Sequence, residues 1–513
     1  MMIHKYGIVI GLVLATCNVT GLRAQDDVAK STETVITTEA VWEEFESLYT
    51  AKQHAKAISL LEKHGQNAGF STEDRARFLG WAAVSCARQD EDTCSSRNAQ
   101  AAIDVDPVIG RYMITQMQGL KEGDLVPTES FLWLLENANN MIQWVDVRTI
   151  RGFFNELIKA SRTADAKAML ENLLALNYSG ANDGVTPEGL WTELARLKAK
   201  AGETEAAAKL LVSHMTHITL LTDIWQDVDF APLWNTLEAE GLFNTDHMLA
   251  KQYEKAQGEA ERARSLGWDA WAGHRLDLIS TLRISGDLDA AGQLADQTLA
   301  VIPDHQMSVE YVGWIKNEVA TILENQNKPE QAIAYMEAMV AVPEEEKQEL
   351  VSHYINLSGM FWQYGRYADA LNAAEDIVEN YKDATTDYGR YWAESARVCA
   401  QTKMGRYFDA NKHWKQLKET PDKNYAATTL MALCMDDMDY TADLYIKRLA
   451  DETQRSSVLT ALSHFKWIGP KTEIFRLRER LSTLLEREDI QAAVAKAGRL
   501  GDWPFPRNYG GQF

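Results

Sequence analysis

The chain lacks the short motifs that mark common catalytic sites. Its 513 residues contain no GxSxG, HExxH or CxxC pattern. A glycine-rich phosphate loop would have to follow a strand, and no stretch longer than a few residues alternates as a strand does. No residue cluster demands catalysis, so we expect no enzyme, no catalytic residue and no cofactor.

Positive charge is also scarce. The 52 Lys and Arg residues stand against 74 Asp and Glu residues, which leaves a formal net charge of −22. Such a chain is repelled by phosphate backbones and by anionic lipid. We therefore expect neither nucleic acid nor a membrane surface as partner.

Long apolar runs are missing too, and the most apolar stretch lies near the N-terminus. Gly7 to Ala15 is a run of about 9 apolar residues, long enough for a signal sequence but too short to span a bilayer. The basic Lys5 precedes it, and a small residue, Ala24, offers a cleavage site. The order of these parts predicts a signal peptide over 1–24 and a mature protein in the periplasm of a Gram-negative cell.

A second interpretation of the same segment remains open. The stretch "LATC" places Cys17 after the apolar run, as in a lipoprotein signal. Thr16 stands where Gly or Ala is usual, which counts against this interpretation. An outer-membrane lipoprotein anchored through Cys17 therefore remains only the alternative to the cleaved signal peptide. No other stretch is predicted to span a membrane.

What the chain does contain is a repeat. "YGRYADALNAAEDIVEN" begins at Tyr364, and "MGRYFDANKHWKQLKET" begins at Met404. Gly365 separates two stripes of apolar residues at helical spacing, so each unit predicts a helical hairpin whose turn needs a left-handed residue. The turn marker recurs with spacings of 41, 38 and 40 residues, at Gly286, Asn327, Gly365 and Gly405. A fixed period of helix pairs is typical of a solenoid.

An earlier unit shows the same pattern. Trp191, Ala195, Gly202 and Ala207 stand as an aromatic, a small residue, a turn glycine and a second small residue. At these positions, and over 270–420, the chain resembles the tetratricopeptide repeat (TPR) family, although its period of about 40 exceeds that family's 34. The resemblance implies an all-α, right-handed solenoid of TPR-like hairpins.

The sequence pattern divides the chain into five predicted segments. They are the signal peptide (1–24), a flexible start (25–39), an irregular array of helix pairs (40–245), a regular TPR-like array (246–488), and a final helix with a Pro- and Gly-containing tail (489–513). The boundary near Thr245 follows a stretch, 222–241, that interrupts the period.

Four cysteines remain if Cys17 leaves with the signal, an even number in a chain expected in an oxidising compartment. Cys86 and Cys94 flank a turn near Asp90 and lie level on antiparallel helices, so we predict a disulfide worth roughly 2–3 kcal/mol. Cys399 and Cys434 are about one repeat apart and are the second candidate pair. The alternative for both pairs is buried thiols.

Two tryptophans lie off the apolar stripes of their helices. In the register of the TPR family, such positions face the concave groove, so Trp314 and Trp362 are candidates for partner binding. The alternative is that both pack against the next repeat. His214 and His217 are the nearest approach to a metal motif, but a zinc site needs at least a third ligand, so we expect no metal.

Two functions are compatible with this sequence. The first is an exported scaffold that binds a protein or peptide partner on its solenoid surface without catalysis. The second is a secreted all-α enzyme, similar to an α/α-barrel, that acts on polysaccharide. The short turns leave little room for the long loops that carry paired carboxylates in such enzymes, so the scaffold is preferred.

Overall fold

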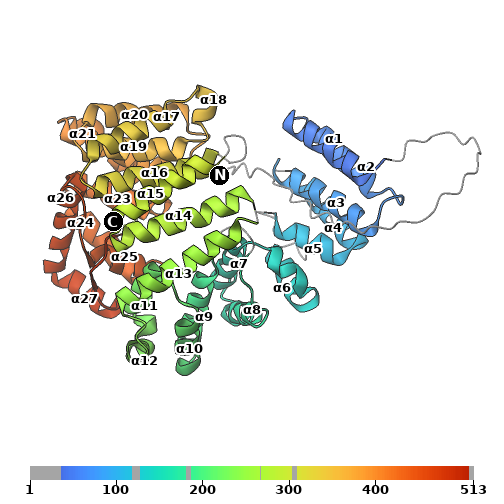
Figure 1. Ribbon diagram of the computed structural model, residues 1–513, viewed down its shortest axis with the longest axis horizontal. Helices are drawn as coiled ribbons and strands as arrows, with labels where there is room; N and C mark the ends of the chain where they lie inside the picture. The colour runs from blue at the N-terminus through green and yellow to red at the C-terminus, as the bar shows by residue number, and fades with distance from the viewer. Residues whose placement is uncertain are drawn as a thin grey trace, which may run out of the picture. The chain divides into compact units, whose positions relative to one another are not determined.

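A computed structural model describes residues 36–89, 91–117, 127–180, 186–265, 267–302 and 309–507. In these residues the chain forms helices α1 to α27, short 3-10 turns and one pair of two-residue strands, which confirms the predicted all-α solenoid of helical hairpins (Figure 1). None of the described helices is both long and apolar enough to cross a membrane. The predicted signal peptide and Cys17 lie outside the described residues.

The chain divides into two compact units after Pro187, away from the boundary predicted near Thr245. The two units are treated separately below. The first helix of the first unit begins at Thr38, so it overlaps the end of the predicted flexible start (25–39). Its elements are α1 (Thr38–Thr50), α2 (His54–Gly65), α3 (Thr72–Ala87), α4 (Asp92–Val105), α5 (Pro107–Thr115), α6 (Pro127–Asn137), η2 (Asn139–Trp144), α7 (Val147–Lys159) and α8 (Thr163–Ala175).

The second unit, 188–507, contains the regular repeats. It opens with α9 (Glu188–Lys200), α10 (Thr204–His214), α11 (Ile218–Gln226), η3 (Val228–Leu233), α12 (Trp234–Ala239), α13 (Thr245–Ala263), α14 (Trp268–Ser285), α15 (Leu288–Val301), α16 (Val309–Asn325), α17 (Pro329–Val340) and α18 (Glu344–Lys347). It continues with α19 (Val351–Gln363), α20 (Tyr367–Asn380), α21 (Asp387–Lys403), α22 (Tyr407–Leu417), η4 (Pro421–Lys423), α23 (Tyr425–Cys434), α24 (Met438–Ala450), α25 (Arg455–Leu462), β1 (His464–Phe465), α26 (Glu473–Ser482), η5 (Thr483–Glu486), α27 (Glu488–Ala497) and β2 (Asp502–Trp503).

The predicted turn residues adopt the left-handed conformation that ends a helix. Their φ angles are +91°, +62°, +82° and +76° at Gly286, Asn327, Gly365 and Gly405. After Gly365 the amide of Arg366 donates to the carbonyl of Phe361 at 2.8 Å, the hydrogen bond that closes such a helix end. The stripe, turn, stripe unit read from the sequence is therefore confirmed.

Other hairpins turn without glycine. Lys52, Ser161 and Asp436 have φ angles of +59°, +58° and +64°, between α1 and α2, α7 and α8, and α23 and α24. A non-glycine residue tolerates this conformation at some cost. Since the sequence marker was Gly or Asn, these three hairpins gave no turn signal.

The second unit closes on itself, whereas the repeat pattern predicted an open array. α25 packs against α11, which precedes it by more than two hundred residues (Figure 1). Asp227, fully buried at the start of η3, accepts hydrogen bonds from Arg196 (2.7 Å), Arg455 (3.1 Å) and Ser456 (3.0 Å). One carboxylate thus joins α9, η3 and α25.

A second set of contacts closes the same join. The guanidinium of Arg499 lies between the rings of Trp225 and Trp234, 3.8 and 3.9 Å from their centroids. Its amide donates to the carbonyl of Gln226 at 2.9 Å. Gly498 passes so close to that carbonyl that a side chain there would clash with it. Helical periodicity carries no signal for such long-range contacts.

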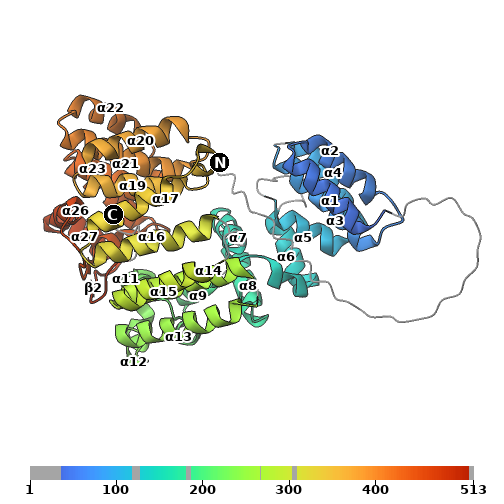
Figure 2. The ribbon, with the colours of Figure 1, turned by 45° about the horizontal axis from the view of Figure 1, so that its top comes forward.

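The segment that follows α25 covers the turn ends of the hairpins. β1, which follows α25, pairs in parallel with β2, so the chain after α27 returns beside β1 (β2 is labelled in Figure 2). Glu473 on α26 accepts from Lys403 at the end of α21 (2.7 Å) and from Tyr367 at the start of α20 (3.3 Å). Arg480 donates to the carbonyl of Leu433 at the end of α23 (3.2 Å). α26 therefore spans several consecutive hairpins.

Candidate functional site

The structure buries Trp362. Its side chain is 1% exposed and belongs to one core with Phe361, Leu433 and two leucines of α26, Leu477 and Leu481. No residue of α19 is fully exposed, because its side chains are either buried or partly buried. The helix is covered by its neighbours and by α26, so Trp362 does not lie on a surface that a partner could reach.

Trp314 is half-buried beside a histidine of the next hairpin. Its ring meets the ring of His353 edge to face, with centroids 4.7 Å apart. His353 is 1% exposed, and burial lowers its pKa to about 4. Gly313 leaves the space that the His353 ring fills. This contact packs α16 against α19, which is the alternative raised for Trp314 from the sequence.

A shallow groove of the first unit lies between α5, α6 and α8. It has a volume of about 430 Å³ and combines apolar side chains, among them Leu132, Trp133 and Met169, with charged side chains at its rim. Arg111 lies over the ring of Trp133, with 4.9 Å between guanidinium and centroid. The groove therefore offers one aromatic ring and a few apolar side chains among several charged groups.

Ion pairs fix the rim of this groove. Arg162, in the turn before α8, bonds to Glu129 on α6 and to Asp165 on α8 (2.6 Å). The hydrogen bonds that Arg162 donates, first to Glu129 and then to Asp165, raise its pKa. The rim holds two arginines, Arg111 and Arg162, and three carboxylates, because Glu136 also lines the groove. The rim thus carries both signs of charge.

Sequence reasoning missed this groove. Trp133 lies within the stretch "SFLWLLEN", where neighbouring apolar residues hide any off-stripe position. The turn beside Arg162 is made at Ser161, without a glycine. The sequence signal that could have indicated the groove is an aromatic residue, Trp133, with charged residues on its own helix and on the neighbouring hairpin.

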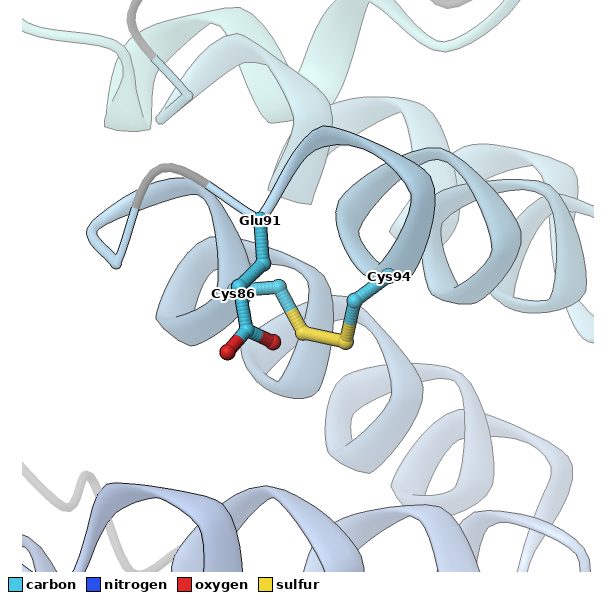
Figure 3. Close-up of side chains that lie close together, drawn as sticks. All are labelled: Cys86, Glu91 and Cys94. Carbon is cyan, nitrogen blue, oxygen red and sulfur yellow. A yellow bond between two sulfur atoms is a disulfide. The ribbon is translucent and has the colours of Figure 1, made fainter.

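Both predicted disulfides are present. Cys86 and Cys94 join α3 to the start of α4, with Cα atoms 5.7 Å apart, and Cys399 and Cys434 join α21 to α23, at 5.3 Å. Figure 3 shows Glu91 beside the first pair. Among the described residues this trio is a group with metal-ligand spacing, but sulfurs bonded to each other are not thiolate ligands.

The disulfides predict a thiol count. Protein taken from its native cells, unfolded without reductant and treated with a thiol label, should show no reactive thiol among Cys86, Cys94, Cys399 and Cys434. The same sample after reduction should show all four. Four labelled thiols before reduction would contradict both bridges and the oxidising compartment, and two would leave one bridge, identified by peptide mapping.

The two predicted histidines make separate contacts. The ring of His214 lies 6.0 Å from that of Trp191, whereas His217 bonds through Nδ1 to the hydroxyl of Thr219 at 2.7 Å. The backbone amide of His217 donates to the buried carboxylate of Glu188 at 3.0 Å. These contacts fasten the start of α11, so each histidine has a packing role.

The most polar buried cluster of the second unit is built around that same Glu188. The carboxylate also accepts from Lys255 on α13 and from Thr216. Burial raises the pKa of Glu188, but Lys255 and these hydrogen bonds outweigh burial, so the pKa lies below its usual value. A carboxylate satisfied on this many sides holds α9, α11 and α13 together and is poorly placed to exchange protons with a substrate.

Comparison with known proteins adds little. No protein-family model matches the chain, and no curated protein matches it either. A solved structure of Naa15/Naa10 bound to HypK-THB is 12% identical, covers 90% of this chain and 77% of that chain, and has a TM-score of 0.29. The TPR domain of P58(IPK) is 12% identical, with coverage of 90% and 98% and a TM-score of 0.18. Scores this low carry no argument, so the fold class rests on the hairpins themselves.

Proposed function

We propose that this protein is an exported, non-catalytic scaffold, and that it binds an extended peptide of a partner protein in the groove between α5, α6 and α8. The observation that carries the proposal is the groove itself, with Trp133 as an aromatic anchor and charges along its rim. Stacked hairpins form a rigid frame for such a surface. The peptide backbone would bond to the rim while one apolar side chain rests on Trp133.

Export is part of this proposal. It is supported by the charge, apolar run and small-residue order of 1–24, and by two disulfides, which persist in oxidising compartments. We place the mature protein in the periplasm, with the outer-membrane lipoprotein as the alternative.

One observation favours the enzyme alternative. The unit 188–507 is closed through Asp227 and Arg499. An α/α-barrel is also a closed ring of helices, whereas an open solenoid is not. A glycosidase, however, needs two carboxyl groups that face each other across a cleft and lie about 5–9.5 Å apart. α26 and its leucines occupy the turn ends of the hairpins in this unit, so the scaffold remains the better supported function.

The groove is tested by replacing its anchor. Full-length protein with Trp133→Ala, immobilised and exposed to a periplasmic extract, should retain about tenfold less of the partner that the wild type retains, because an aromatic anchor is a typical hot spot. Trp144→Ala is the matched control: Trp144 follows the same helix, is 60% exposed and does not line the groove.

Both variants should keep the melting temperature of the wild type to within a few degrees, since neither residue belongs to the buried core. Mass spectrometry of the retained proteins identifies the partner. Equal retention by Trp133→Ala and wild type, or equal loss in both variants, would exclude the groove as the binding site.

A further inference from the structure

The turn between α21 and α22 exposes three apolar side chains. Phe408 is 85% exposed, Tyr407 62% and Met404 43%. Phe408 lies one turn before Lys412 on the same face of α22, and Lys415 continues that face. Below, the α22 patch means Met404, Tyr407, Phe408, Lys412 and Lys415.

The repeats themselves show that folding does not require Phe408. The residue three positions after the turn residue lies in the first turn of the second helix of each hairpin, where the helix dipole favours an acid. In the other hairpins of this unit that residue is an acid or alanine: Glu205, Asp289, Glu330, Ala368 and Asp439. Phe408 stands where these hairpins keep an acid or a small residue, and its ring is exposed.

Tyr407 supports the same conclusion. Its counterpart in the preceding hairpin is Tyr367, which α26 covers and which bonds to Glu473 at 3.3 Å. Tyr407 lies beyond that cover. A cluster of exposed apolar side chains at a position that neighbouring hairpins keep polar or covered indicates an interaction surface.

The charge around the patch indicates what binds there. Residues 403–418 carry five Lys or Arg residues and one acid, Asp409, within a chain whose net charge is −22. Lys403 is paired with Glu473 and Arg406 with Asp409. Lys412 and Lys415 are exposed, and neither has an ion-pair partner among the described residues. An acidic segment would be repelled by most of this protein and attracted to this helix.

We propose that the α22 patch docks an acidic segment of a partner protein, with an apolar side chain of that segment against Phe408 and its carboxylates on Lys412 and Lys415. The inference rests on the proposed scaffold function and adds a second surface to it. The two surfaces differ in chemistry, since the groove rim carries both signs of charge and the patch carries positive charge.

The probe is a fluorescein-labelled peptide of glutamates interspersed with leucine and phenylalanine, and its twin carries lysine in place of each glutamate. Fluorescence anisotropy with full-length protein should show binding of the acidic peptide alone, weakening as salt screens the charges. Phe408→Asp, which restores the residue type of the neighbouring hairpins, should lower the affinity about tenfold or more.

Two control variants separate the outcomes. Ala368→Asp changes the same position of the preceding hairpin and should leave the affinity unchanged. Trp133→Ala should also leave it unchanged, so failure of the patch and failure of the groove are distinguished. Equal binding of both peptides, or an unchanged affinity in Phe408→Asp, would overturn the inference.

Two other occupants would also overturn it. One is a second copy of the chain, seen as a concentration-dependent mass in sedimentation that Phe408→Asp abolishes. The other is an anionic membrane, seen as Phe408-dependent binding to phosphatidylglycerol vesicles without binding of the acidic peptide.

Discussion

Replacing Trp362 with alanine should destabilise the 188–507 unit by about 3–5 kcal/mol, the range found when a buried large aromatic residue is truncated. The side chain is 1% exposed and packs between α19, α23 and α26. Its indole Nε1 has no hydrogen-bond partner among the described residues. The whole cost therefore comes from lost contacts and the cavity left behind, measured as the change in the urea midpoint followed by far-UV circular dichroism.

Trp362→Phe is the matched control, because it keeps an aromatic ring and loses no hydrogen bond. It should cost clearly less than the alanine variant. Trp314→Ala, at a half-buried position, should also cost less. An alanine variant as stable as the wild type, but weaker in partner capture, would restore the interpretation of Trp362 as a groove residue.

Replacing Asp227 with alanine should open the join between α11 and α25. The variant leaves the guanidiniums of Arg196 and Arg455 in a site with little access to water and removes a buried partner of both. Breaking a buried ion pair on one side costs about 3–5 kcal/mol. Hydrogen exchange of the full-length protein should show faster exchange over 218–234 and 455–500, with the first unit unchanged.

Glu452→Gln is the control for that experiment. The pair between Lys200 and Glu452 crosses the same join at 2.6 Å, but its glutamate is 64% exposed, and exposed pairs contribute about 0–1 kcal/mol. Faster exchange in this variant but not in Asp227→Ala would contradict the role assigned to Asp227.

The same join should respond to pH in two directions. Burial raises the pKa of Asp227, but Arg196 and the hydrogen bonds outweigh it, so the folded pKa is depressed. Its contribution is present above the unfolded value near about 3.9 and is lost as the pH falls through the folded value. Burial raises the pKa of the neighbouring Asp223 to about 7, so its contribution is fully present below the unfolded value of about 3.9 and is lost as the pH rises from there through about 7. Stability of the join should therefore be greatest near a pH of about 4 and fall in both directions.

The hairpins could be predicted from sequence because their signals are local. A glycine or asparagine at a left-handed turn and two apolar stripes lie within forty residues of one another, as at Gly365. The two cysteine pairs followed from turn and repeat geometry. The closure could not be predicted, since Asp227 and Arg455 belong to segments that no period connects.

The site was harder to predict than the fold. An off-stripe position indicates a groove only where that face of the helix is free, and the face of α19 that holds Trp362 is buried by neighbours that include α26. Trp362 was therefore placed in a groove that the chain itself fills. Trp133 and Phe408 became visible only once burial and exposure were known.

Photo-crosslinking shows most directly whether a partner peptide binds in the groove between α5, α6 and α8. A photoreactive amino acid replaces Leu132, which lines the groove, in the full-length protein, and irradiation takes place in living cells. If a peptide binds in the groove, we expect crosslinks from this position to one short segment of a partner protein. These crosslinks should be abolished by Trp133→Ala and absent when the photoreactive residue replaces Trp144. Crosslinks of equal yield from both positions, or none from Leu132, would contradict it.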